Sequence, residues 1–287
     1  MTAQGSETKL LQWHPAFYAG IQVEFADEAE KLIFENEHQL SKKPMGIDVL
    51  IIKKKSEDQI KKNIGRIFRK HNIIEYKSPD DYLSIDDFYK VYGYACFYKS
   101  DTKHIDSIKV DEITISFVCE SWPRNFIKHL ENHKKYEIVK ADKGIYYILG
   151  DIFPIQLILT SELSKESNFW LRNLTNNLKE HREVIDLATE YEKNRNNLLY
   201  KAMMEVIVRA NEVLFEEVKE RDMCEALKEL FRDEIEEATK KARSEALIEG
   251  ETKAFIKLVH EGILSINDVA KRLNITETEV EALLTKN

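Results

Sequence analysis

Residues 46–79, GIDVLIIKKKSEDQIKKNIGRIFRKHNIIEYKSP, decide the fold that the rest of the chain must complete. Two short runs rich in β-branched residues, at 46–55 and 72–79, are typical of buried strands. In the second run Glu75 and Lys77 are two residues apart, so on a strand both side chains leave the same face of the sheet. In the first run Asp48 is an acid among apolar neighbours.

If these two strands pair, Asp48, Glu75 and Lys77 can meet at one edge of a buried sheet. Unpaired carboxylates are costly to bury, so such a cluster must be neutralised. A hard divalent cation, Mg²⁺ or Mn²⁺, binds one or two carboxylates together with waters and a phosphate oxygen. Lys77 would then position a water and stabilise charge that develops on the phosphate. An ordinary ion-pair network among the same side chains is the alternative.

The segments on either side predict an α/β order. Apolar residues at helical spacing predict a helix over 15–27, and strands are expected within 31–40, 46–55 and 62–79. A helix capped by Ser84 or Asp86 follows, then a strand at 112–121 and a helix that begins at Pro123. Residues 136–141 and 144–150 predict a hairpin. The order is therefore helix, three strands, helix, strand, followed by additions.

The C-terminal part of the chain is expected to be all-α. We divide the sequence into 10–180, a long charged helical region at 181–250 and a small helical tail at 251–287. An apolar stripe that includes Met203, Ile207 and Leu214 is compatible with packing against a neighbouring helix and with the seam of a coiled-coil homodimer. The tail has helix-turn-helix spacing, but its last helix is acidic, so packing and DNA reading both stay open.

Charge is unevenly distributed along a chain of 287 residues with a net charge of −8. Between residues 42 and 77 the net charge is +7, and between 180 and 250 it is −7. A basic surface of this kind can follow a phosphate backbone. A solvated loop is the alternative, because Glu57 and Asp58 are interleaved. The expected nucleic-acid-binding residues are Lys53, Lys54, Lys55, Lys61, Lys62, Arg66, Arg69 and Lys70.

Composition excludes several classes of protein. Hydrophobic residues make up 43% of the chain, which excludes a disordered polypeptide. No run of 18 apolar residues and no signal-peptide core is present, so we expect a soluble cytoplasmic protein without a membrane partner. The three cysteines form no CxxC pair, and no glycine-rich phosphate loop supports a nucleotide enzyme.

The element order, together with Glu24, Asp48 and Glu75-x-Lys77, resembles the PD-(D/E)XK nuclease superfamily. The amino-acid sequences of several segments are similar to those of the recombination-promoting nuclease/putative transposase family. The segments that carry this likeness are WHPAFYAGIQVEF (13–25), GIDVLIIKKK (46–55), GRIFRKHNIIEYKSPDDYLSIDDFYKVYGYACFY (65–98) and LGDIFPIQLILTSELSKESNFWLRNLT (149–175).

The resemblance implies a role for each matching residue. Asp48 and Glu75 would bind the metal, Lys77 would be the catalytic lysine, and Glu24 would be the acid of the first helix, with Glu28 as its alternative. Tyr89 or Tyr92 on the following helix can complete such a site or belong to the core. The chain departs from the family pattern before Asp48, where Ile47 and Gly46 stand and the nearest proline is Pro44.

Two functions of different classes therefore compete. The first is a metal-dependent endonuclease that cleaves DNA, linked by the resemblance to recombination or mobile elements. The second is a catalytically inactive, nuclease-like interaction or DNA-binding module that self-associates through its helical half. The first requires turnover with Mg²⁺ or Mn²⁺, and the second predicts binding without it.

Overall fold

A computed structural model describes residues 11–35, 50–102 and 104–219, and in the tail Phe255, 258–259, 264–273, 276–277, Val280 and Leu284. The predicted metal ligand Asp48 and residues 220–254 lie outside these described residues. The chain divides into two compact units, Met1–Ala226 and Leu227–Asn287. Each unit is described by itself.

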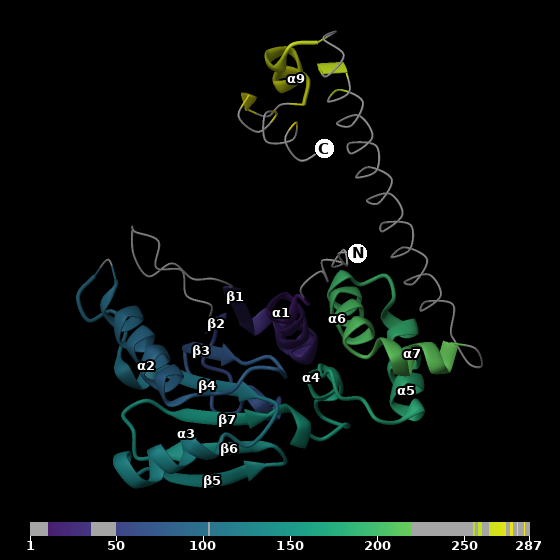
Figure 1. The fold of residues 1–287 in the computed structure, drawn as a ribbon. Coiled ribbons are helices and arrows are strands. Elements are labelled where there is room, and N and C mark those ends of the chain that lie inside the picture. Colours follow the sequence, from purple (N-terminus) through teal and green to yellow (C-terminus); the bar gives the residue numbers. More distant parts are fainter. Residues whose placement is uncertain are drawn as a thin grey trace. The chain divides into compact units, whose positions relative to one another are not determined.

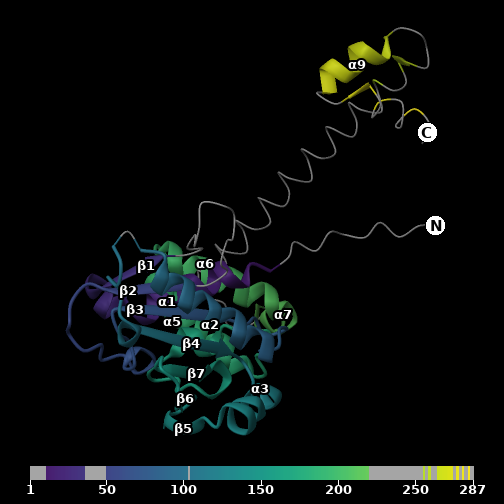
Figure 2. The same ribbon diagram turned by 90° about the vertical axis from the view of Figure 1, so that its left-hand side faces the viewer.

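Within its described part, the first unit is built on one seven-stranded mixed sheet with the order β1-β2-β3-β4-β7-β6-β5, which the labels of Figures 1 and 2 follow from top to bottom. β3, β4 and β7 are parallel neighbours, and the outer pairs are antiparallel. The three parallel strands are buried along their whole lengths, as expected for strands covered on both faces. The strands are β1 (Leu32–Glu35), β2 (Leu50–Lys54), β3 (His71–Tyr76), β4 (Ile113–Cys119), β5 (Glu137–Asp142), β6 (Ile145–Leu149) and β7 (Ile155–Leu159).

Helix α1 (Trp13–Glu24) covers one face of the sheet. Phe17 of this helix stacks on Tyr76 of β3, with ring centroids 4.1 Å apart. Helix α6 (Leu198–Ala210) lies along α1 (Figure 1). A Cβ on Gly20 would lie 3.0 Å from the Met203 methyl carbon, so glycine permits this close approach. Met203 of the apolar stripe therefore packs against a neighbouring helix.

Helices α2 (Ile85–Ser100) and α3 (Arg124–His129) cover the opposite face. Phe88 of α2 and Phe126 of α3 both pack against Phe117 of β4, with ring centroids 6.0 Å and 5.1 Å from it. Phe117 lies beside Glu75 in the parallel ladder of β3 and β4. Because side chains alternate along a strand, Glu75 faces α2 while Tyr76 faces α1.

The α/β class and the predicted hairpin are confirmed, since β5 and β6 pair antiparallel. Strand β7 was not expected from the sequence. This strand is a short apolar run after Pro154 that enters the sheet between β4 and β6. A fully buried strand lacks the alternation of polar and apolar residues by which strands are recognised, so periodicity alone could not find it.

An irregular segment at residues 174–180 separates α4 (Phe169–Asn173) from α5 (His181–Asn194). There Asn211 donates to the carbonyl oxygen of Thr175 at 2.7 Å and accepts from the amide of Leu178 at 3.0 Å. Side-chain hydrogen bonds of this kind give the backbone an alternative to the helix. The last described helix of the first unit is α7 (Glu212–Lys219).

The second unit contains α9 (Ile266–Leu273), which begins after Ser265. The Ser265 hydroxyl accepts from the amide of Asp268 at 3.2 Å and donates to its carboxylate at 2.6 Å. Val269, Ala270 and Val280 form its described core. Among the described residues of the whole chain, no helix is long and apolar enough to cross a membrane.

Asn72 connects three strands of the sheet. Its fully buried side-chain amide donates to the carbonyl oxygens of Ile52 at 2.9 Å and Arg69 at 2.8 Å. Its oxygen accepts from the amide of Arg69 at 2.8 Å and from the Thr114 hydroxyl at 2.6 Å. A buried amide with all its hydrogen bonds made specifies one packing arrangement.

We expect Asn72→Ala to lower the free energy of unfolding by about 2–4 kcal/mol, because it leaves several buried groups unpaired. Chemical denaturation measures this loss. Asn177→Ala, at an exposed site, is the control and should stay within about 0.5 kcal/mol. Equal effects of the two substitutions would contradict the assigned role of Asn72.

His71, at the start of β3, makes stability depend on pH. Burial, assisted by Lys70 and Lys53, lowers its pKa from 6.5 to about 4. Its Nδ1 lies 2.9 Å from the Tyr98 hydroxyl. Because the folded state keeps His71 neutral, its contribution to stability is complete above pH 6.5 and is lost as the pH falls towards about 4.

We therefore expect His71→Gln to flatten the fall of unfolding free energy between pH 6.5 and pH 4. One proton taken up on unfolding corresponds to a slope of about 1.4 kcal/mol per pH unit. Denaturant titrations across this range measure the slope. His104→Gln, at an exposed position, should leave the slope as it is, and a wild-type slope in His71→Gln would refute the assignment.

Candidate functional site

Glu75 and Lys77 lie at the C-terminal end of β3, where the sheet turns towards α2. The amide of Lys77 still donates to the carbonyl oxygen of Val118 at 2.9 Å, so the backbone follows β4 one residue beyond the strand. The Glu75 side chain is 3% exposed and that of Lys77 is 18% exposed. The strand thus holds a buried carboxylate beside a largely buried ammonium on one face, as the spacing predicts.

The Lys77 ammonium bridges two carboxylates. Its Nζ lies 2.8 Å from Oδ1 of Asp87 and 3.3 Å from Oε1 of Glu75. Asp87 comes from the first turn of α2, so the contact joins this helix to the end of β3. Sequence reasoning did not find Asp87, although the Ser84-x-x-Asp87 spacing at the predicted start of the helix was the available signal.

A capping box fixes the position of Asp87. Its Oδ2 accepts from the backbone amide of Ser84 at 2.8 Å and from the Ser84 hydroxyl at 2.7 Å. The Ser84 hydroxyl accepts from the Asp87 amide at 3.2 Å. Oδ2 of Asp87 therefore caps the start of α2, and Oδ1 binds the Lys77 ammonium.

The three side chains have different electrostatic environments. Burial raises the pKa of Glu75 and outweighs the opposing effect of Lys77. Burial also disfavours the charged form of Lys77, but its contacts with Asp87 and Glu75 prevail and raise its pKa. For Asp87, hydrogen bonds from Lys77 and Ser84 overcome burial and lower the pKa. The charged forms of Lys77 and Asp87 are therefore favoured in the folded protein. The charged form of Glu75 is disfavoured by burial, so Glu75 is the strained member of the cluster.

The Glu75 carboxylate is suited to be one ligand of a divalent cation. Its Oε2 is buried and has no hydrogen-bond partner among the described residues. An orphaned, buried carboxylate oxygen is costly unless a cation or a donor meets it. The described residues contain no group of three or more His, Cys, Asp or Glu side chains that could hold a metal. Asp48, the second predicted ligand, lies outside them.

The structure does not bring Glu24 to this site. Glu24 ends α1 on the opposite face, where it forms an ion pair with Lys62 and accepts from the amide of Leu171 at 3.0 Å. Phe17, which stacks on Tyr76, lies about 10 Å earlier along the same helix by helical rise. The alternative acid, Glu28, accepts from the amides of Lys61 and Lys62 at 3.0 Å each.

Four of the predicted basic residues, Lys53, Lys54, Arg69 and Lys70, lie at or beside the start of β3, where Lys53 is opposite His71 and the amide of Lys54 donates to the carbonyl oxygen of Lys70. A strand rises about 3.3 Å per residue, so the start of β3 is separated from Glu75 by well over 10 Å. In the described part of the chain, four residues of the basic set form ion pairs with acids. These ion pairs are Lys53 with Glu35 at 2.5 Å, Lys62 with Glu24, Arg66 with Asp142 at 3.4 Å and Lys70 with Glu112 at 3.7 Å.

Four basic residues of the predicted set, Lys54, Lys55, Lys61 and Arg69, form no ion pair with a carboxylate within the described residues. All are exposed or partly exposed. The positive charges of these four side chains are therefore not neutralised by an ion pair within the described residues.

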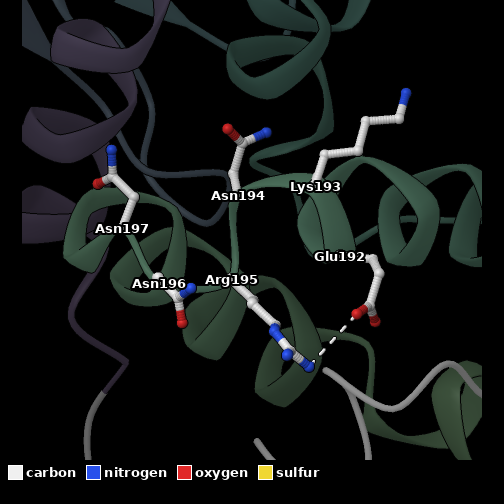
Figure 3. A pocket seen from close by; sticks show the side chains of 6 residues that line it. All are labelled: Glu192, Lys193, Asn194, Arg195, Asn196 and Asn197. Atoms are coloured by element: carbon white, nitrogen blue, oxygen red, sulfur yellow. Dashed lines mark hydrogen bonds and ion pairs between the residues drawn. The ribbon is translucent and has the colours of Figure 1, made fainter.

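Two pockets of the first unit lie away from Glu75 and Lys77. The first, shown in Figure 3, is lined by six consecutive residues, 192–197, at the turn between α5 and α6. Within it Arg195 donates to Glu192 at 3.5 Å, and no segment distant in sequence contributes to its lining. The second pocket joins Glu24 and Ser167 to the three predicted bases Lys61, Lys62 and Arg66. Neither pocket is lined by Glu75 or Lys77.

The two tyrosines considered for the site take part in a different cluster. The Tyr89 hydroxyl lies 2.9 Å from Nε2 of His129, and its side chain is 48% exposed. Burial, with the nearby Asp151 carboxylate, raises the pKa of Tyr92 to about 12. These contacts connect α2 to α3 and the following strands.

Comparisons with known proteins add no relative. No protein-family model, no curated protein and no solved structure matches the chain. The function must therefore be argued from the residues themselves.

We expect Glu75→Gln to leave the melting temperature at pH 8 at least as high as that of the wild type. The raised pKa means that the folded state favours protonated Glu75, so its charge lowers stability once the pH exceeds the folded pKa. The neutral amide removes that cost. Calorimetry at pH 8 measures the difference.

Glu28→Gln is the matched control and should lower the melting temperature, because hydrogen bonds from Lys61 and Lys62 outweigh burial and lower the pKa of Glu28. A larger loss in Glu75→Gln than in Glu28→Gln would contradict the assigned strain at Glu75.

Proposed function

We propose that the protein is a metal-dependent endonuclease with a PD-(D/E)XK-type core, which hydrolyses phosphodiester bonds of DNA. The observation that carries the proposal is the buried Glu75 carboxylate, with one orphaned oxygen, beside a lysine that a second carboxylate holds in place. Most buried polar side-chain atoms in proteins are hydrogen-bonded, and a buried carboxylate is costly without a partner, so the orphaned oxygen of Glu75 supports a cation ligand at this position.

The proposed reaction is the hydrolysis of one P–O bond. The oxygen of a water attacks phosphorus, the bond to the leaving oxygen breaks, and that oxygen takes up a proton. A Mg²⁺ or Mn²⁺ ion bound by Asp48 and Glu75 would activate the water and offset charge on the phosphate. Lys77, kept charged by Asp87, donates a hydrogen bond to the water or to a phosphate oxygen.

DNA is the proposed substrate because the chain segment that leads into β3 carries basic side chains that form no ion pair within the described residues. Lys54, Lys55, Lys61 and Arg69 provide positive charge that can follow a phosphate backbone, whereas several of the other predicted bases are already neutralised. In this proposal Lys54 and Arg69 contact the phosphate backbone beside the start of β3, and the chemistry takes place at the other end of the strand. Self-association through the C-terminal helices would bring two such sites to one duplex.

The rival proposal is a DNA-binding or interaction module without turnover. It is favoured by the position of Lys77, whose ammonium is engaged by two carboxylates at once. Binding of a divalent cation separates the two proposals, since only the endonuclease needs Glu75 to take up a cation.

Supercoiled plasmid incubated with the full chain should be nicked with Mg²⁺ or Mn²⁺ and stay intact with EDTA. We expect Asp48→Ala, Glu75→Ala and Lys77→Ala each to lower the rate by at least about 10²-fold, the usual loss when one stabilising group is removed from such a site. Gel analysis of time courses gives the rates.

Lys99→Ala is the matched control, because Lys99 is also on the α2 side and pairs with Asp106 at 3.0 Å. It should cleave at the wild-type rate. Cleavage that survives in Lys77→Ala, or that persists in EDTA, would refute the proposed site.

A further inference from the structure

We infer that Asp87 is a positioning residue, which keeps the Lys77 ammonium in the site when Glu75 takes up a divalent cation. This inference rests on the proposed function and adds a residue to it. Three features of the site support the inference: the unequal contacts of Lys77, the hydrogen bonds that hold Asp87, and the Glu75 oxygen that has no partner among the described residues.

The first observation is that Lys77 is bound more closely by Asp87 than by Glu75. Its Nζ lies 2.8 Å from Asp87 and 3.3 Å from Glu75. Charge-assisted hydrogen bonds between an ammonium and a carboxylate are strongest near 2.7–2.9 Å. The contact with Glu75 is therefore the one that Lys77 gives up more easily.

The second observation is that Asp87 is held before any cation arrives. The amide and hydroxyl of Ser84 both donate to its Oδ2, at 2.8 Å and 2.7 Å, while Oδ1 faces Lys77. A side chain fixed in this way loses little freedom when it holds a partner. Asp87 thus offers Lys77 a fixed anchor on the first turn of α2.

The third observation concerns Glu75. Its Oε1 faces Lys77, whereas its buried Oε2 has no hydrogen-bond partner among the described residues. A divalent cation at Glu75 repels the nearby ammonium. If Glu75 were the sole anchor of Lys77, the lysine would compete with the cation for the carboxylate. Asp87 lets Lys77 release Glu75 and remain in place.

The test is a double-mutant cycle on Mn²⁺ affinity, measured with the full chain by the loss of the electron paramagnetic resonance signal of free Mn²⁺. The four proteins are the wild type, Asp87→Asn, Lys77→Ala and the double variant. We expect Asp87→Asn to weaken Mn²⁺ binding by about three- to tenfold, within the range of couplings between residues in contact. The same substitution in the Lys77→Ala background should change the Kd by less than about twofold.

Two controls separate positioning from charge and from folding. Asp86→Asn removes the same charge at the preceding, exposed position of α2 and should leave the Kd unchanged. Asp87→Glu, which keeps the carboxylate, should recover part of the lost affinity. In plasmid cleavage, Asp87→Asn should lower kcat and leave KM within about twofold, a split that a general loss of folded protein would not produce.

Two results would overturn the inference while the proposed function stands. One is an unchanged Kd in Asp87→Asn. The other is an equal loss of affinity with and without Lys77, which would mean that Asp87 acts on the cation directly. If the wild type neither binds Mn²⁺ nor cleaves plasmid, the proposed function fails and this inference fails with it.

Discussion

The burial of the Glu75 carboxylate is the constraint on which the site depends. A central strand covered on both faces is the costliest place in the first unit for a charge, and the raised pKa of Glu75 reflects that cost. Lys77 offsets only part of it, because its ammonium is shared with Asp87. Asp87 in turn needs Ser84 and the first turn of α2. The helix, the strand end and the two ion pairs are therefore one coupled arrangement.

This arrangement explains why stability and the proposed function would oppose each other at Glu75. A neutral side chain of the same shape would suit the buried strand better, so the charge is a cost to the fold. Asn72, on the same strand, shows the contrasting case, because each of its polar atoms has a partner and it holds β2, β3 and β4 together. His71, Glu75 and Tyr76 of the same strand each have one buried polar atom without a hydrogen-bond partner among the described residues. Glu75 is the carboxylate of the three, and it is the functional candidate.

The sequence predicted the parts of this picture that depend on local spacing. Glu75 and Lys77 share a face because a strand has a period of two, and the helix that follows begins after Ser84 as its capping residues indicate. Asp87 was not predicted because it meets Lys77, ten residues earlier in the chain, only when α2 docks against β3. Glu24 was expected beside Glu75, yet α1 ends on the opposite face, where Lys62 holds it. The position of a helix end relative to a sheet is a tertiary property that periodicity does not report.

In the proposed site Glu75 takes up a divalent cation while Asp87 retains Lys77. The anomalous signal of manganese from a crystal of the full chain grown with Mn²⁺ shows whether both occur together. We expect an anomalous peak in direct contact with Oε2 of Glu75, with the Lys77 ammonium still bonded to Asp87. An anomalous map without a peak at Glu75, with Lys77 still bridging both carboxylates, would contradict it.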